Sequence, residues 1–95
     1  MKIVFSPVAF QDLQRLYKFF KETNPPSITK AAERLKKGFG TLRQYPLAGY
    51  PLESLPPFRE LLVPFGRGNF IIRYQLGEET VNVVHLWHSR EERED

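Results

Sequence analysis

Basic residues and a histidine recur in the last third of the chain, where short apolar runs begin or end. Arg59 stands near the start of the first run, Arg73 near the end of the second, and His88 at the end of the third. Cutting RNA requires a base for the 2′-hydroxyl, an acid for the leaving oxygen, and cations on the phosphate. One candidate set is therefore His88 as acid or base, Glu53 or Glu60 as base, and Arg59, Arg67 and Arg73 on the phosphate.

Each of these residues also has a purely structural interpretation. His88 at a strand end can simply bond a backbone carbonyl. Arg59 and Arg73 can pair across strands with nearby glutamates. Trp87 is expected in the core or against a helix, because aromatic residues at alternating strand positions are usually buried. Arg67 stands in a glycine-flanked turn and is exposed under either interpretation.

Other kinds of site find little support. The chain has no cysteine, which excludes disulfides and thiolate metal sites. His85 and His88 are expected on opposite faces of one strand, so they cannot ligate the same metal. The glycines around Arg67 lie between strands rather than before a helix, which argues against a phosphate-binding loop. The sequence predicts no metal site and no cofactor.

The charge is divided unevenly between the two halves of the chain. Residues 1–50 hold nine Lys or Arg against three acids, a balance of +6, whereas residues 51–95 hold five Arg against eight acids, a balance of −3. The basic half is expected to attract a polyanion or an acidic protein partner. The alternative interpretation is a lysine-rich, solvated helical face.

Size and composition predict one folded domain over residues 1–95. A hydrophobic fraction of 41% and an aromatic fraction of 14% argue against disorder, and a chain of 95 residues supports a single core. No apolar run approaches the roughly 20 residues that cross a bilayer, and the N-terminal segment lacks the pattern of a signal peptide. We therefore expect a cytoplasmic protein without a membrane partner.

The first half reads as a short strand followed by two amphipathic helices. The run 2–5 is β-type, and Ser6-Pro7 is a typical helix start. Apolar spacing then predicts helices over about 7–22 and 27–45, the second weakened near Gly38 and Gly40. The short, proline-containing turn between them makes the pair an antiparallel hairpin.

The second half reads as an extended connector and three strands. Four prolines and a glycine occupy residues 46–57, which predicts a connector without an element of its own. Strands are expected over 58–63, 70–76 and 81–88, joined by short turns that impose antiparallel pairing. Strict alternation in the last strand places Val81, Val83, His85 and Trp87 on one face and Asn82, Val84, Leu86 and His88 on the other. The charged residues 91–95 are expected to fray.

The element order predicts an α+β fold: an N-terminal strand, an antiparallel helical hairpin, and a three-stranded antiparallel meander, with the helices packed on one face of the sheet. The apolar residues of hairpin and sheet should then form one cluster. Its expected members are Leu13, Leu16, Phe20, Leu35, Phe39, Leu42, Ile72, Tyr74 and Val83.

This order of motifs resembles the RelE/ParE toxins of bacterial type II toxin–antitoxin systems over nearly the whole chain. The pieces that carry the resemblance are Ser6-Pro7, Asp12-Leu13, Pro46, Gly49, Phe58-Arg59-Glu60-Leu61, Ile72-Arg73-Tyr74 and His88-Ser89-Arg90. The resemblance implies a toxin that is silenced by a cognate antitoxin. It also implies one of two activities, inhibition of DNA gyrase or ribosome-dependent cleavage of mRNA.

Two departures favour the ParE branch. The RNA-cleaving branch usually has an arginine three residues before the strand tyrosine, and that position is Ile71 here. The connector also lacks the lysines with which such nucleases hold RNA. The resemblance then implies no catalytic residue, and we expect target binding by the basic helix face and the C-terminal region, through Arg15, Lys18, Lys36, Lys37 and Arg90.

Two alternatives stay open. In the first, the chain is a RelE-type endoribonuclease that acts on mRNA in the ribosome through His88, Arg59, Arg73 and Arg67. In the second, it is an inactive relative that only binds its antitoxin. Under each hypothesis the expected partner is an acidic, partly disordered antitoxin that folds on the apolar groove beside the basic helices.

Overall fold

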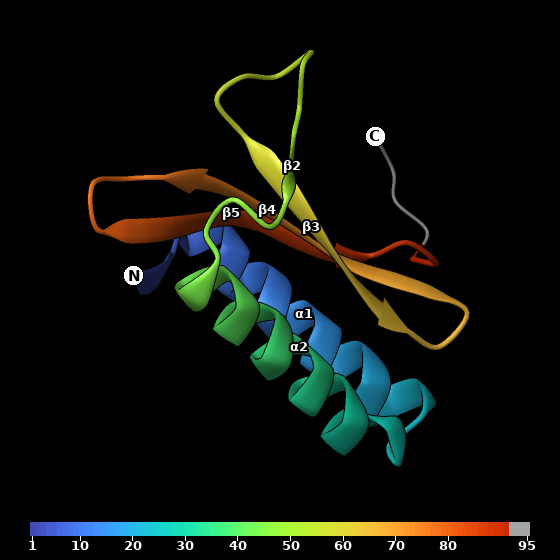
Figure 1. The fold of residues 1–95 in the computed structure, drawn as a ribbon. Coiled ribbons are helices and arrows are strands. Elements are labelled where there is room, and N and C mark those ends of the chain that lie inside the picture. Colours follow the sequence, from blue (N-terminus) through green and yellow to red (C-terminus); the bar gives the residue numbers. More distant parts are fainter. Residues whose placement is uncertain (92–95) are drawn as a thin grey trace.

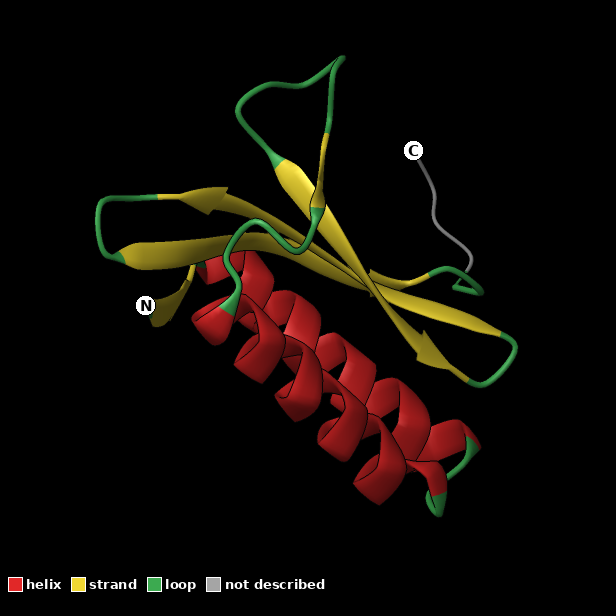
Figure 2. Cartoon of the chain, in the orientation of Figure 1, coloured by secondary structure: helices red, strands yellow, loops and turns green. Residues whose placement is uncertain are grey.

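The fold is one mixed sheet with a helical hairpin on one of its faces, as Figures 1 and 2 show. The computed structural model describes residues 1–91. Its elements are β1 (Lys2–Phe5), α1 (Pro7–Thr23), α2 (Ser27–Gln44), β2 (Tyr50–Pro51), β3 (Arg59–Phe65), β4 (Gly68–Leu76) and β5 (Thr80–His88). The predicted α+β architecture is confirmed. Of the tail that we expected to fray, residues 92–95 lie outside the described part.

Both helices begin and end within one residue of their predicted bounds. The Ser6 hydroxyl accepts the Ala9 N–H at 3.0 Å, and Pro7 occupies the first helical position, so two features of the sequence fix the start of α1. Helix α2 continues through both glycines. A Cβ at Gly38 would lie 2.7 Å from Val63 Cγ2, so this glycine lets α2 approach β3 closely.

The strands are ordered β1-β5-β4-β3-β2. The predicted meander is present, with β3, β4 and β5 paired antiparallel in sequence order. Strand β1 runs parallel to β5, with Phe5 opposite Val83. The N-terminal strand therefore lies beside the last strand of the meander, and α1 starts from the edge of β5.

The connector and the first strand of the meander differ from our expectation. Tyr50 and Pro51 form a two-residue strand that pairs with Glu60 and Arg59, whereas we expected no element there. Strand β3 also passes through Pro64 instead of ending before it. Proline is tolerated because β2 covers only the first two residues of β3, which leaves Pro64 on an open edge where no ladder bond is lost.

A β-bulge overturns the predicted alternation in β5. Arg73 lies opposite His85 and Tyr74 lies opposite Val83, so Val84 is an extra residue without a partner on β4. One extra residue in a strand moves every side chain after it to the opposite face of the sheet. Leu86 and His88 therefore face the helices, while His85 and Trp87 turn to the open face. The prediction of Trp87 as a core residue is wrong, because it is half-buried there beneath the Arg73 guanidinium.

The core lies between the hairpin and the sheet, and the predicted cluster is confirmed. Leu16, Leu35, Leu42, Ile72, Tyr74 and Val83 are buried in it, and Leu13, Phe20 and Phe39 pack against it partly buried. The buried Tyr74 also holds the connector in place. Its hydroxyl donates to the Pro46 carbonyl at 2.7 Å and accepts the Gly49 N–H at 2.9 Å.

Candidate functional site

The two arginines of the first and second meander strands have structural partners. Arg59 donates to the backbone carbonyls of Gly49 at 3.0 Å and Leu47 at 3.2 Å, which fastens the connector to β3. Arg73 forms an ion pair with Glu60 at 2.8 Å. The interpretation of Arg73 as a cross-strand partner of a glutamate is therefore confirmed, whereas the same interpretation of Arg59 is wrong, because Arg59 bonds backbone carbonyls instead.

His88 uses both ring nitrogens within the fold. Its Nδ1 accepts the Arg90 N–H at 3.1 Å, so the proton is assigned to Nε2, which donates to the Phe65 carbonyl at 2.9 Å. The ring is only 9% exposed and packs edge-on against Phe65 and Phe70. The structural interpretation of His88, as a partner of a backbone carbonyl, is confirmed.

The four residues of the nuclease hypothesis do not converge on one site. Arg73 projects from the open face of the sheet, whereas His88 lies on the face that carries the helices. Arg67 is exposed in the β3–β4 turn, next to Gly66 with its φ of 63°. The arrangement supplies no common position for a phosphate among these side chains.

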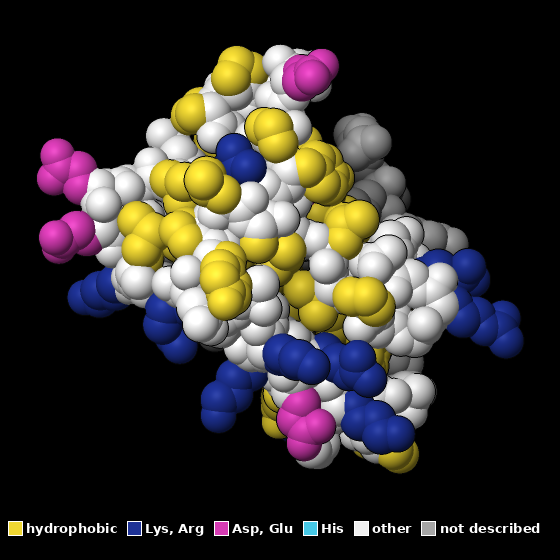
Figure 3. Space-filling model, viewed as in Figure 1, with side chains coloured by type: hydrophobic (Ala, Val, Ile, Leu, Met, Phe, Trp, Pro, Cys, Tyr) yellow, Lys and Arg dark blue, Asp and Glu magenta, His cyan; other side chains and the backbone are white. Residues whose placement is uncertain are grey.

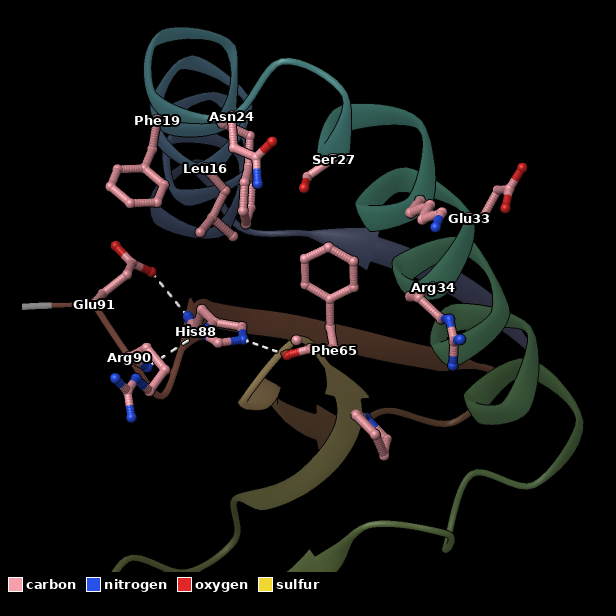
Figure 4. Close-up of a pocket in the computed structure, with 14 residues that line it drawn as sticks. Leu16, Phe19, Asn24, Ser27, Glu33, Arg34, Phe65, His88, Arg90 and Glu91 are labelled. Atoms are coloured by element: carbon pink, nitrogen blue, oxygen red, sulfur yellow. Dashed lines mark hydrogen bonds between the residues drawn. The ribbon is translucent and has the colours of Figure 1, made fainter.

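A cleft opens where the turn between the helices faces the β3–β4 turn, and we call it the end cleft (Figure 4). Its volume is about 750 Å³. Apolar side chains of α1 and β3 line part of it, and the cations Lys30, Arg34 and Arg90 outnumber the carboxylates Glu33 and Glu91. The full lining is Leu16, Phe19, Phe20, Asn24, Ser27, Lys30, Glu33, Arg34, Pro64, Phe65, Gly66, His88, Arg90 and Glu91.

Basic side chains gather over the helices in Figure 3. Lys18 of α1 and Lys36 and Lys37 of α2 are exposed, as is Arg90, which follows β5. Arg15 differs from them, because it forms ion pairs with Asp12 and Glu91 and donates to the Leu86 carbonyl at 3.1 Å. Burial acts to lower the pKa of Arg15, but the bonds and charges of Glu91 and Asp12 outweigh it and raise this pKa above its ordinary value.

Asp12, which was expected only as part of a family motif, joins α1 to β5. Its Oδ2 accepts the Leu86 N–H at 2.9 Å and lies 3.1 Å from His85 Nδ1, while its Oδ1 pairs with Arg15. Burial acts to raise the pKa of Asp12, but these bonds together lower it below its ordinary value. The three-residue spacing from Asp12 to Arg15 on a helix was the one available signal.

Glu60 is a second buried carboxylate, and it lies on the open face of the sheet. It is 7% exposed, and it accepts the Tyr50 hydroxyl at 3.0 Å and Arg73 Nε at 2.9 Å. Burial and the neighbouring Glu60 charge raise the pKa of Tyr50, while Arg73 opposes this rise. The sequence suggested Glu60 as a base but gave no reason to group it with Tyr50.

Comparisons with known proteins agree on one family. A family model described as the ParE toxin of a type II toxin–antitoxin system, parDE, matches residues 3–93. Toxin RelE1 of Caulobacter vibrioides is 30% identical over 91 residues, which cover 96% of each chain. A solved chain of the chromosomal ParDE toxin–antitoxin system from P. aeruginosa superposes with a TM-score of 0.75 at 21% identity, covering 93% of this chain and 95% of that one. Within residues 1–91, no helix is long and apolar enough to cross a membrane.

Proposed function

The chain belongs to the ParE toxin family of type II toxin–antitoxin systems, and from this premise we propose that it arrests growth by inhibiting DNA gyrase in the cytoplasm. One observation carries the choice of target. Among the nuclease candidates, Arg59, Arg73 and His88 are occupied by contacts that stabilise the fold. A toxin that acts by binding needs exposed contact residues instead, and a basic helix face together with Arg90 offers them.

We assign target binding to Lys18, Lys36, Lys37 and Arg90, which are exposed. Arg15 belonged to the expected set, but two carboxylates hold it. Its contribution is to fix the segment that carries Arg90, because Glu91 accepts Arg15 Nε at 3.1 Å and also the His88 N–H at 2.8 Å.

The antitoxin is assigned to the end cleft. A lining of apolar side chains with an excess of lysine and arginine over glutamate suits a segment that alternates apolar and acidic side chains. Such a segment would cover Arg90 as it binds. The antitoxin would then neutralise the toxin because it competes with the target for Arg90.

Replacing Arg90 with alanine is expected to raise the toxin concentration that half-inhibits gyrase supercoiling by about tenfold, the equivalent of about 1.4 kcal/mol of binding free energy. The measurement is a supercoiling assay with purified gyrase and purified toxin. Arg67→Ala is the matched control, because it removes another exposed arginine from the same end of the sheet, and it should leave inhibition unchanged.

Assays with the same purified proteins distinguish gyrase inhibition from ribosome-dependent RNA cleavage. If wild-type toxin left gyrase untouched but cut mRNA only in the presence of ribosomes, the gyrase proposal would be wrong and the RelE-type alternative would hold. Loss of inhibition in Arg67→Ala but not in Arg90→Ala would contradict the assignment of the contact residues.

Reversing two charges of the end cleft, with Lys30→Glu and Arg34→Glu together, should weaken antitoxin binding at least about tenfold, because acidic side chains would then face like charges. Calorimetric titration with the cognate antitoxin provides the measurement, at low and high salt. Arg43→Glu is the control, since this exposed arginine lies at the opposite end of α2 from the cleft-lining Lys30. Equal weakening by both variants would place the antitoxin elsewhere.

A further inference from the structure

The segment that follows β5 carries Arg90, and side chains that can change charge hold this segment in place. The Glu91 carboxylate pairs with Arg15 and accepts the His88 N–H at 2.8 Å. The Arg90 N–H donates to Nδ1 of the His88 ring at 3.1 Å. Figure 4 shows these bonds meeting at His88, on the wall of the end cleft. The position of Arg90 therefore depends on the state of the His88 ring.

The bond to the Arg90 backbone requires a neutral imidazole. In the neutral ring one nitrogen donates and the other accepts, and here Nε2 donates to the Phe65 carbonyl at 2.9 Å, which leaves Nδ1 as the acceptor. In a protonated ring both nitrogens carry hydrogen and donate. Nδ1 and the Arg90 N–H would then be two donors that face each other. Protonation of His88 therefore removes the bond to Arg90 but keeps the bond to Phe65.

The surroundings of the ring keep it from turning away from this conflict. The ring of His88 packs edge-on against Phe65 and Phe70, with centroids 6.2 and 5.2 Å apart. Turning the ring over would also break the bond from Nε2 to the Phe65 carbonyl. Arg90, by contrast, is exposed, and an exposed segment near a chain end moves at little cost. Protonation is therefore expected to displace Arg90 rather than His88.

The charges around His88 act in the same direction. The lining side chains from α1 and β3 are apolar, and β4 contributes the ring of Phe70. The ionisable groups that share the end cleft with His88 come from α2 and from the segment after β5: Lys30, Glu33, Arg34, Arg90 and Glu91. Arg15 reaches this group from α1 and already pairs with Glu91. Cations therefore exceed unpaired carboxylates, and a positive charge on His88 would repel the Arg90 side chain.

We propose that His88 is a pH-sensitive switch that sets the position of Arg90. The neutral ring holds the Arg90 N–H, whereas the protonated ring releases it. Histidine takes up a proton between about pH 8 and pH 5, so the bond is present at the upper end of this range and is lost as pH falls. Inhibition of the target should weaken in mild acid. This effect on the target rests on the proposed function, in which Arg90 is a contact residue, but the displacement of Arg90 does not.

Amide hydrogen exchange, followed by NMR on the purified chain between about pH 8 and pH 5, tests the switch without any partner. After correction for the intrinsic exchange rate at each pH, protection of the Arg90 amide should fall about fivefold on acidification, the effect of losing one hydrogen bond. The Ser89 amide is the internal control, because it donates to the Asn69 carbonyl at 2.8 Å and should keep its protection. Constant protection of Arg90 while the His88 ring titrates would overturn the proposal.

The chain has two histidines, so a matched pair of variants identifies the ring that is responsible. His88→Asn keeps an acceptor near the position of Nδ1 but cannot take up a proton, so the Arg90 amide should stay protected at every pH. His85→Gln removes the histidine on the open face, and its Arg90 amide should respond to pH as in wild type. The second variant decides the matter even if the first does not fold, because a pH response that disappeared in His85→Gln would contradict the assignment to His88.

A gyrase supercoiling assay at about pH 8 and about pH 6 tests the consequence for function. Relative to His88→Asn at the same pH, wild-type toxin should need about threefold more protein for half-inhibition at the lower pH and the same amount at the higher pH. The comparison within each pH removes the response of gyrase itself. If the Arg90 amide responded to pH but no gyrase were inhibited at either pH, the proposed function would fail and the switch would stand. Equal inhibition by wild type and His88→Asn at both pH values would show that the switch does not control the target contact.

Discussion

Replacing Asp12 with alanine is expected to lower the free energy of unfolding by about 3 kcal/mol at neutral pH, because hydrogen bonds to a charged group are lost and a buried donor is left without an acceptor. The orphaned donor is the Leu86 N–H, which Asp12 accepts at 2.9 Å in the core-facing part of β5. Arg15 is half exposed and keeps Glu91 as a partner, so its charge is not left buried and unpaired. Urea denaturation measures the change.

The pH dependence identifies the charge as the cause. The folded pKa of Asp12 is below its ordinary value, so the unfolded chain binds the proton more tightly. Its contribution to stability is therefore complete above about pH 4 and is lost as pH falls through the folded pKa. Asp12→Asn cannot titrate, so its deficit relative to wild type should be largest at neutral pH and shrink below about pH 4.

Glu22→Gln provides the comparison for Asp12→Asn, because it neutralises an exposed carboxylate on the same helix. Its stability should follow that of wild type at every pH. A deficit of Asp12→Asn that stayed constant from pH 7 to pH 3 would show that shape, rather than charge, makes Asp12 stabilising.

Local patterns were sufficient to predict every element of the fold except β2. Ser6 specifies the start of α1 through its hydrogen bond with the Ala9 N–H, and Pro7 does so through its fixed φ angle. Neither effect depends on residues that are distant in the sequence. The bulge at Val84 could not be read in this way. Its presence depends on how β5 pairs with β4 on one side while α1 meets its edge on the other, and alternation in the sequence is unchanged by it. Because of this one unpaired residue, Trp87 lies on the open face of the sheet and not on the face that packs against the helices.

The candidate site shows the same limit more sharply. Exposure of Lys18 and Arg90 followed from polarity alone, whereas the partners of Arg15 did not, because Glu91 lies 76 residues away. From the sequence, His85 was considered only as a possible metal ligand, since its contact with Asp12 spans 73 residues. Residue types indicate which chemistry is possible, but long-range pairing determines which side chains come into contact.

Replacing Leu35 with alanine is expected to cost about 2–5 kcal/mol, the usual range for emptying a buried leucine site. Leu35 is 6% exposed and belongs to the core between α2 and the sheet. Leu47→Ala is the matched control, because the same atoms are removed from a side chain that is 67% exposed, and it should change stability by less than about 0.5 kcal/mol. Since a domain has only about 5–15 kcal/mol in total, thermal unfolding will resolve the difference. Equal melting temperatures for the two variants would mean that the hairpin does not pack on the sheet through Leu35.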